Sequence, residues 1–197
     1  IHNSVNKITL NNDASQYNNT VFAYGNSNLM NTLTTSTFNN CRFRFAGAAF
    51  SASLSTNIFN NCIWELIASA CNLGTATISG GTYTNTTGAF TNTGNITDLT
   101  YNATTGAFTN TGVVTGLSGY TTTSTYTNTG NFINNYLSGT SVTFAATKSN
   151  IPSIISGNTG VNVGINNAYG LFYENTGFDL ATSAQLYGGT IIYDSNN

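Results

Sequence analysis

Carboxylates are the first side chains to consider, because cleavage of a glycosidic bond ordinarily needs two of them about 5–10 Å apart. The chain has six, namely Asp13, Glu65, Asp98, Glu174, Asp179 and Asp194. When the repeats of the chain are aligned, none of them shares a column with another. Glu65 instead lies one repeat after Arg44, a spacing that predicts an ion pair between neighbouring strands. The sequence therefore predicts no catalytic carboxylate pair and favours a protein that is not an enzyme.

Sulfur and imidazole ligands offer no clearer site. Cys41 and Cys62 occupy the same position of two repeats and Cys71 follows shortly afterwards, but no Cys-x-x-Cys pair is present. The single histidine is His2. Zinc sites need several such ligands at short spacings. We therefore expect buried free thiols, no metal site and no cofactor.

The charge content excludes two classes of partner. Four Lys/Arg and six Asp/Glu give a net charge of −2, and charged residues make up 5% of the 197 residues, where about 25% is usual. Asparagine (32) and threonine (35) supply most of the polar surface. Four scattered cations cannot neutralise the phosphates of a nucleic acid, and no segment approaches the ~18 apolar residues of a membrane helix. We expect no nucleic-acid binding and no membrane insertion.

Threonine pairs indicate a different chemistry. Thr-Asn-Thr recurs at 91–93, 109–111 and 127–129, at one constant interval. This pattern resembles the threonine ranks of insect β-helical antifreeze proteins, in which both threonines must point outward. The second threonine aligns with Cys41 and Cys62, which predicts that the two threonines of a pair face different ways. Ice binding is therefore an alternative interpretation.

The cysteines, Glu65 and the threonine pairs lie in repeated sequence units, and the fold of those units determines their positions. FNNCRFRF at 38–45 returns as FNNCIWEL at 59–66 and is preceded by YNNTVFAY at 17–24, with the same interval between successive copies. Apolar and polar side chains alternate within a copy, which is typical of a strand with one buried face. A unit of about 20 residues cannot bury its own apolar side, so successive copies must stack as a solenoid with equivalent residues about 4.8 Å apart.

The second half repeats with a shorter period. GAFTNTG at 88–94 recurs at 106–112, and STYTNTG follows at 124–130. Together the two halves suggest one template of aromatic, any residue, Asn, then Thr or Cys; the register near residues 78–90 stays open. Asparagine tolerates left-handed backbone angles and forms side-chain ladders. The expected ladder comprises Asn19, Asn40, Asn61, Asn92, Asn110 and Asn128.

The predicted fold is all-β, a parallel β-helix (solenoid) of about seven coils with roughly 18–21 residues per coil over residues 1–150. The template fades near Pro152, so residues 151–197 are expected to form an irregular β segment that acts as a cap, a trimerisation element or a tip. Aromatic residues of this segment depart from the repeat and are our candidates for ligand binding: Tyr169, Phe172, Tyr173, Tyr187 and Tyr193.

The FNNC-type repeat, the asparagine column at a bend and the short coils resemble the right-handed parallel β-helix, a family that includes pectate lyases and the shafts of bacteriophage tailspikes and tail fibres. The resemblance covers roughly residues 5–150. The low charge and the richness in Asn, Thr and Gly are most similar to a tail fibre or a bacterial surface adhesin. Such proteins are commonly homotrimers that bind cell-surface glycans or proteins, which implies a virion, extracellular or cell-surface location.

The main hypothesis is thus a structural and attachment protein, the receptor-binding or shaft segment of a tail fibre, tailspike or adhesin. A glycan-degrading β-helix enzyme, an ice-binding β-helix and a self-assembling extracellular filament subunit are the alternatives.

Overall fold

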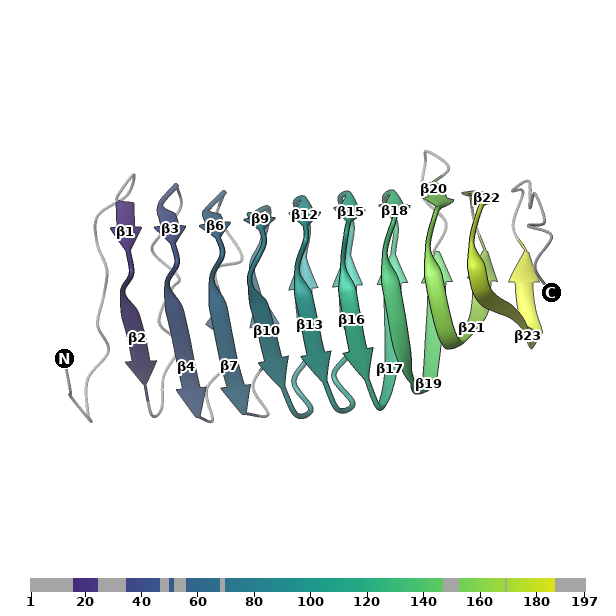
Figure 1. Cartoon of the computed structure of the whole chain (residues 1–197), viewed down its shortest axis with the longest axis horizontal. Helices are drawn as coiled ribbons and strands as arrows, with labels where there is room; N and C mark the ends of the chain where they lie inside the picture. The colour runs from purple at the N-terminus through teal and green to yellow at the C-terminus, as the bar shows by residue number, and fades with distance from the viewer. Residues whose placement is uncertain are drawn as a thin grey trace.

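The structure is a computed structural model that describes residues 16–24, 35–46, 50–51, 56–67, 70–146, 153–168 and 170–186. Within these residues every regular element is a β-strand, and the strands pair in parallel. Successive turns lie side by side along the long axis of the molecule (Figure 1). The chain is a parallel β-solenoid.

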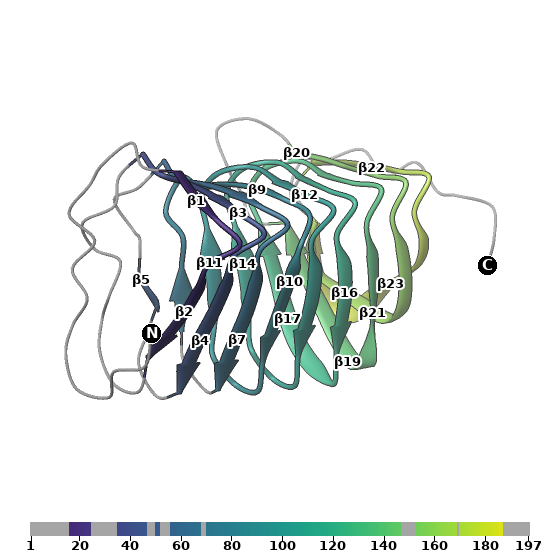
Figure 2. The same ribbon diagram turned by 60° about the vertical axis from the view of Figure 1, so that its left-hand side comes forward.

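Three faces run along the solenoid (Figure 2). The first face is a nine-stranded sheet of β1 (Gln16–Asn18), β3 (Thr37–Asn39), β6 (Ile58–Asn60), β9 (Thr77–Ser79), β12 (Ile96–Thr97), β15 (Val114–Thr115), β18 (Phe132–Ile133), β20 (Ser153–Ser156) and β22 (Gly170–Tyr173). The second face begins with β2 (Val21–Tyr24), β4 (Arg42–Ala46), β7 (Ile63–Ile67), β10 (Thr82–Asn85), β13 (Thr100–Ala103) and β16 (Ser118–Thr121). The third face begins with β5 (Phe50–Ser51), β8 (Cys71–Asn72), β11 (Phe90–Asn92), β14 (Phe108–Asn110) and β17 (Thr123–Asn128).

The second and third faces join at a long strand, β19 (Tyr136–Ala146). Its first residues pair with β16 and its last residues pair with β17, so one strand serves both faces. The following long strands, β21 (Thr159–Ala168) and β23 (Thr176–Leu186), stack on β19 in turn.

Turn length decreases from the N-terminal turns to the central turns. Equivalent residues of the N-terminal turns, such as Asn39 and Asn60, are 21 residues apart. Those of the central turns, such as Asn92 and Asn110, are 18 residues apart. Seven of the described strands of the first face precede residue 150, so the predicted fold class, coil length and approximate number of coils are confirmed.

The segment after residue 150 continues the same sheets. β20 pairs with β18, and β22 pairs with β20, both in parallel. The irregularity lies in the register: β21 is bulged against both β19 and β23. The described strands of this segment therefore add turns to the solenoid, and its expected role as a cap, trimerisation element or tip stays a prediction.

The register near residues 78–90 shows that the two halves do not share one template. Tyr83 pairs with Trp64 of the second face, whereas Phe90 pairs with Cys71 of the third face. The two aromatic-x-Asn motifs that begin at these residues thus occupy two faces of one turn. Thr82 pairs with Ile63, so the residue that lies next to Cys62 in the following turn is Gly81. The alignment of the TNT threonines with the cysteines was therefore wrong.

The corner between the first and second faces is closed by one left-handed residue per turn. These residues have φ between 50° and 69° and are Asn19, Asn40, Asn61, Gly80, Asp98, Gly116, Asn134, Gly157 and Glu174. Asparagine, aspartate and glycine adopt this conformation most readily. Where a glycine follows, the side chain of the previous turn occupies its space: a Cβ on Gly80 would lie 2.2 Å from Oδ1 of Asn61.

Aromatic rings fill the first turns as two stacked columns. Phe38 stacks on Phe59 with ring centroids 5.0 Å apart, and Phe43 stacks on Trp64 at 5.8 Å. The columns meet edge to face, with Phe59 and Trp64 at 5.3 Å, and all four side chains are fully buried. These are the arrangements that aromatic rings prefer, so the rings stabilise the stacking of turns as well as the core.

Asparagines form a ladder at the surface of the N-terminal turns. The side-chain amide of Asn39 donates to Oδ1 of Asn18, and that of Asn60 donates to Oδ1 of Asn39, both at 2.8 Å. This ladder lies one residue before the expected one. The expected members are the exposed left-handed corner residues Asn19, Asn40 and Asn61.

Two further ladders are buried except at Asn175, which is half-buried. On the third face Asn92 donates to Asn110 at 3.1 Å and Asn110 donates to Asn128 at 3.3 Å, at the residues where a ladder was expected. The other was not foreseen: Asn135 donates to Asn158 at 2.9 Å and Asn158 to Asn175 at 2.7 Å, immediately after the left-handed corner. Its members lie at two unequal intervals, 23 and then 17 residues. A search for one constant period cannot find them.

Candidate functional surfaces

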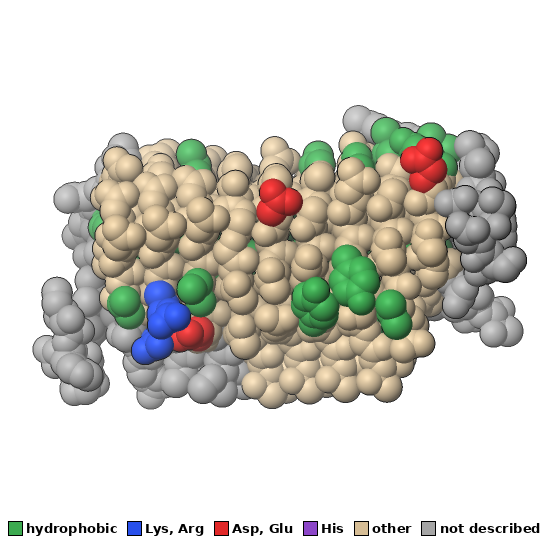
Figure 3. All heavy atoms as spheres, viewed as in Figure 1, with side chains coloured by type: hydrophobic (Ala, Val, Ile, Leu, Met, Phe, Trp, Pro, Cys, Tyr) green, Lys and Arg blue, Asp and Glu red, His purple; other side chains and the backbone are tan. Residues whose placement is uncertain are grey.

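The carboxylates described by the structure lie on separate turns. Glu65 accepts a hydrogen bond from Nε of Arg44 at 2.5 Å and lies 3.6 Å from Nε of Arg42. Asp98 and Glu174 are exposed members of the left-handed corner, four turns apart. Figure 3 shows the basic side chains together beside one acidic group, with the other acidic groups elsewhere on this surface. Asp13, Asp194 and the side chain of Asp179 lie outside the described residues.

The cysteines lie inside the solenoid. Sγ of Cys62 donates to the backbone oxygen of Phe38 at 3.4 Å, and Sγ of Cys41 donates to that of Tyr17 at 3.5 Å. Burial raises the pKa of the Cys62 thiol to about 12 and raises the pKa of Cys41 and Cys71 as well. These thiols are protonated at neutral pH and are not poised as nucleophiles.

Neither a metal cluster nor a membrane helix is found in the described part of the chain. No group of three or more His, Cys, Asp or Glu side chains there lies close enough to hold a metal ion. The same residues contain no helix long and apolar enough to cross a membrane.

The third face carries a regular array of threonines. The middle asparagines of the TNT motifs are buried, whereas Thr93 and Thr111 are exposed and Thr91 and Thr109 are half-buried on the outward side of their strands. Both threonines of these pairs therefore point outward. The expectation that they face different ways was wrong, because it depended on the alignment with the cysteine column.

Neighbouring outward columns widen this array. We define the threonine face as the outward side chains of β11, β14, β17 and the end of β19, together with those of the residues just before β11 and β14. One column consists of Ala89, Ala107, Thr125 and Thr143, and the next of Thr87, Thr105, Thr123 and Ser141. Every position in these two columns is exposed or half-buried. The array is interrupted at Ala145, which follows Thr127 in its column and is 7% exposed.

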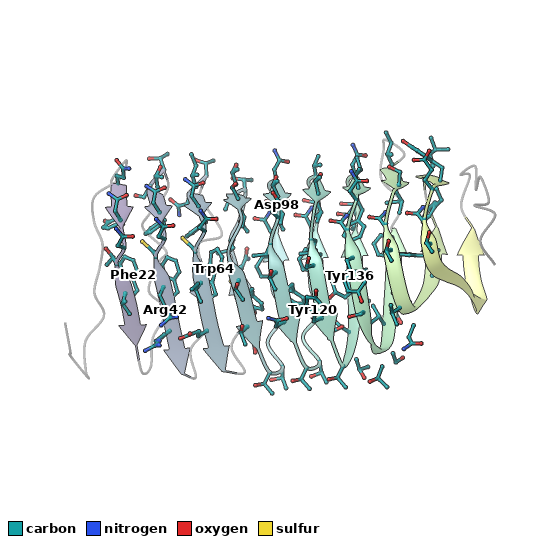
Figure 4. All side chains as sticks on the ribbon, in the orientation of Figure 1. Phe22, Arg42, Trp64, Asp98, Tyr120 and Tyr136 are labelled. Carbon is teal, nitrogen blue, oxygen red and sulfur yellow. The ribbon has the colours of Figure 1, made fainter. Side chains whose placement is uncertain are left out.

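The second face carries an outward pair of tyrosines. Tyr120 is 47% exposed, Tyr136 is half-buried, and their ring centroids lie 5.6 Å apart with the planes at 52°. Figure 4 shows both side chains on the same stretch of this face. Sequence reasoning missed this pair, although a signal was present: Tyr83, Tyr101 and Gly119 recur at equal intervals in one inward column, which forces Tyr120 outward.

Two of the five aromatic residues expected to bind a ligand are described by the structure, and their side chains lie on opposite sides of β22. Phe172 is 4% exposed and pairs with Ile155 inside the first face, so its expected outward position was wrong. Tyr173, the next residue, is half-buried on the outward side of β22. Tyr169, Tyr187 and Tyr193 lie outside the described residues.

Comparison of the chain with models of protein families, with curated proteins and with solved structures gave no match.

Proposed function

We propose that the chain is a non-enzymatic attachment element, a rigid β-solenoid that displays binding side chains, of the type used in viral tail fibres, tailspikes and bacterial adhesins. The interior side chains pack against one another, because stacked rings and asparagine ladders fill the interior from turn to turn. Binding must then come from outward side chains. The observation that carries the proposal is the tyrosine pair Tyr120 and Tyr136, because aromatic rings left on the surface of a polar solenoid are a recurrent feature of recognition surfaces.

The proposed setting is a virion, an extracellular structure or a cell surface, where the chain acts as a homotrimer and binds a surface glycan or protein. Light scattering of the purified chain measures the oligomer, and flow cytometry of the fluorescently labelled chain on a panel of bacterial cells measures attachment. We expect a trimer and saturable binding to some of the strains. A stable monomer that binds none of them would contradict the proposal.

Ice binding is a second candidate, and the threonine face favours it. Its columns repeat about every 4.8 Å between turns, and outward residues repeat about every 6.6 Å along a strand. Hydroxyl and methyl groups on such a fixed grid can hold a layer of ordered water, because immobilising surface water costs little free energy when each molecule keeps its hydrogen bonds.

Thermal hysteresis tests this second candidate. The wild-type chain should depress the freezing point below the melting point, and Thr109→Tyr should abolish the effect because its ring stands above the grid. Thr97→Tyr, at an exposed position on the first face, is the matched control and should retain full hysteresis. A wild-type chain that shows no hysteresis at millimolar concentration contradicts ice binding without affecting the attachment proposal.

A further inference from the structure

The outward position of Tyr120 is fixed by the packing inside the solenoid. Its neighbour Gly119 points inward, and a Cβ there would lie 2.5 Å from the hydroxyl oxygen of Tyr126 and 2.7 Å from a methyl carbon of Leu137. Position 119 therefore cannot hold a larger side chain, and the strand cannot shift by one residue to bury the tyrosine. The core gains nothing from an aromatic ring at position 120, so its presence there needs a separate cause.

The two tyrosines form one surface. Ser118 pairs with Tyr136 and Tyr120 pairs with Ser138, so the rings lie on the diagonal of adjacent parallel strands. Their planes differ by 52° and their centroids lie 5.6 Å apart, which gives an angled apolar surface about the size of one sugar ring. Tyrosine offers such a rigid amphipathic surface at a low cost in conformational entropy.

Neutral hydrogen-bonding groups surround the rings. Asn102 precedes Tyr120 in its outward column, and Ser138 follows it, both half-buried. The strands β10, β13, β16 and β19 contain no charged residue. Arg44 and Glu65 stand in the same column as Tyr120. Glu65 is three turns from Tyr120, about 14 Å at 4.8 Å per turn, and the exposed Asp98 is two turns and two residues from Tyr136, about 12 Å. Both distances exceed the screening length of about 8 Å at physiological salt.

The size of the surface distinguishes a saccharide from a protein partner. A stable protein interface buries about 800 Å² on each side, from about 20–30 residues. The exposed apolar groups here are a tyrosine pair and Val161, two turns beyond Tyr120 in its column and 45% exposed. Apolar groups spaced along the axis and separated by polar side chains suit the alternating CH and OH groups of an extended oligosaccharide.

We infer that Tyr120 and Tyr136 form a binding site for an uncharged oligosaccharide that runs along the second face. The inference rests on the proposed attachment function and gives that function a site and a ligand class. A sugar ring stacks on the tyrosines, and Asn102, Ser118 and Ser138 hydrogen-bond to its hydroxyl groups.

A glycan array tests the inference with the full chain. The array carries neutral oligomers of glucose, galactose, mannose and N-acetylglucosamine, together with oligogalacturonate and sialylated oligosaccharides. Calorimetry with the best-bound neutral oligomer then compares the wild type with Tyr120→Ala and Tyr136→Ala, each expected to weaken binding about tenfold, as for a central aromatic contact. Tyr120→Phe keeps the ring and should change affinity less than about threefold. Tyr173→Ala removes an outward tyrosine from the first face and should leave affinity unchanged.

The results separate the site from the attachment function. Circular dichroism melting of each variant shows whether it is folded, and surface positions should change stability little. An array that binds only acidic oligosaccharides, or a neutral oligomer whose affinity neither alanine variant changes, overturns the inference even if the chain attaches to cells. Tyrosine-dependent binding of a neutral oligomer by a chain that attaches to no cell supports the site and contradicts the attachment proposal.

Discussion

The N-terminal turns and the central turns place asparagine differently. Between β1 and β7 stacked rings and thiols fill most of the interior, which also holds the buried Asn57, and the ladder of Asn18, Asn39 and Asn60 lies at least partly in solvent. Between β11 and β17 the ladder is inside, where Asn92 and Asn110 are fully buried. Water replaces a lost hydrogen bond at the surface but not in the core. The side-chain hydrogen bonds of an asparagine ladder therefore contribute more to stability in the central turns than in the N-terminal turns.

The largest effect should come from the aromatic columns of the N-terminal turns. Phe59→Ala removes a fully buried ring that stacks on Phe38 and meets Trp64 edge to face, and should lower the free energy of unfolding by about 3–5 kcal/mol. Ile58→Ala is the control, because Ile58 is 41% exposed, and should cost less than about 1 kcal/mol. Urea titration measures both; a small loss for Phe59→Ala would mean that the rings do not support this part of the solenoid.

Substitution of a ladder asparagine should lower the free energy of unfolding more in the buried ladder of the third face than in the surface ladder of the N-terminal turns. Asn110→Ala leaves the amide of Asn92 and the Oδ1 of Asn128 without their partners inside the core, and should cost at least about 2 kcal/mol, since each of the two buried unpaired groups costs about 1–3 kcal/mol. Asn39→Ala breaks two equivalent bonds at the surface and should cost about 1 kcal/mol or less. Equal losses in urea titration would remove the distinction between the regions.

Alkaline pH should act through the thiols. The pKa of Cys62 is raised from 9.0 to about 12 in the fold, so the folded chain holds a proton that the unfolded chain releases above pH 9. The stabilisation is complete below pH 9 and is lost progressively as the pH rises towards 12. Between pH 8 and 10 the loss from Cys62 should be about 1.4 kcal/mol, and Cys62→Ala should flatten the pH dependence of the urea midpoint by that amount. An unchanged pH dependence would contradict the burial of this thiol.

The smallest effect should come from the ion pairs. Arg42, Arg44 and Glu65 have side chains 37–52% exposed, so Glu65→Gln should lower the free energy of unfolding by only about 0.2–1 kcal/mol. High salt should reduce the difference from the wild type. Thr84→Ala, one turn further along the same outward column, is the control and should show no dependence on salt. A loss for Glu65→Gln well beyond the range of exposed ion pairs would show that Glu65 does more than pair with the arginines.

The repeat made the fold predictable, but not the face on which each copy lies. Strand alternation and a short, constant period are enough to predict parallel stacking. The motifs around Phe59 and Phe90 look alike locally because both are strands that end in asparagine, yet they lie on different faces. The pairing of Phe59 with Ile78 and that of Phe90 with Cys71 resolve this. The surface ladder was misplaced by one residue for a related reason: of two adjacent asparagines, one takes the left-handed corner and the other the ladder, and composition does not distinguish them.

The candidate surfaces were less predictable, because outward positions are not constrained by stacking. The search for outward aromatics favoured the C-terminal segment, where the repeat fades, whereas Phe172 is inside and the exposed pair is in the regular part. Tyr120 differs from the buried tyrosines only by its phase in the strand. That phase became clear once Gly119 was placed in the inward column.

The left-handed corner allows the length of the solenoid to follow from the number of sequence repeats. Each turn needs one residue that tolerates positive φ, and Asn, Asp, Gly and even Glu serve. A tandem duplication of one repeat in the central turns would thus insert one complete turn, with its own corner, its own ladder member and one more rank on each outward face. A single genetic event would lengthen the rod by about 4.8 Å and enlarge its threonine grid in the same step, so reach and surface area can evolve together.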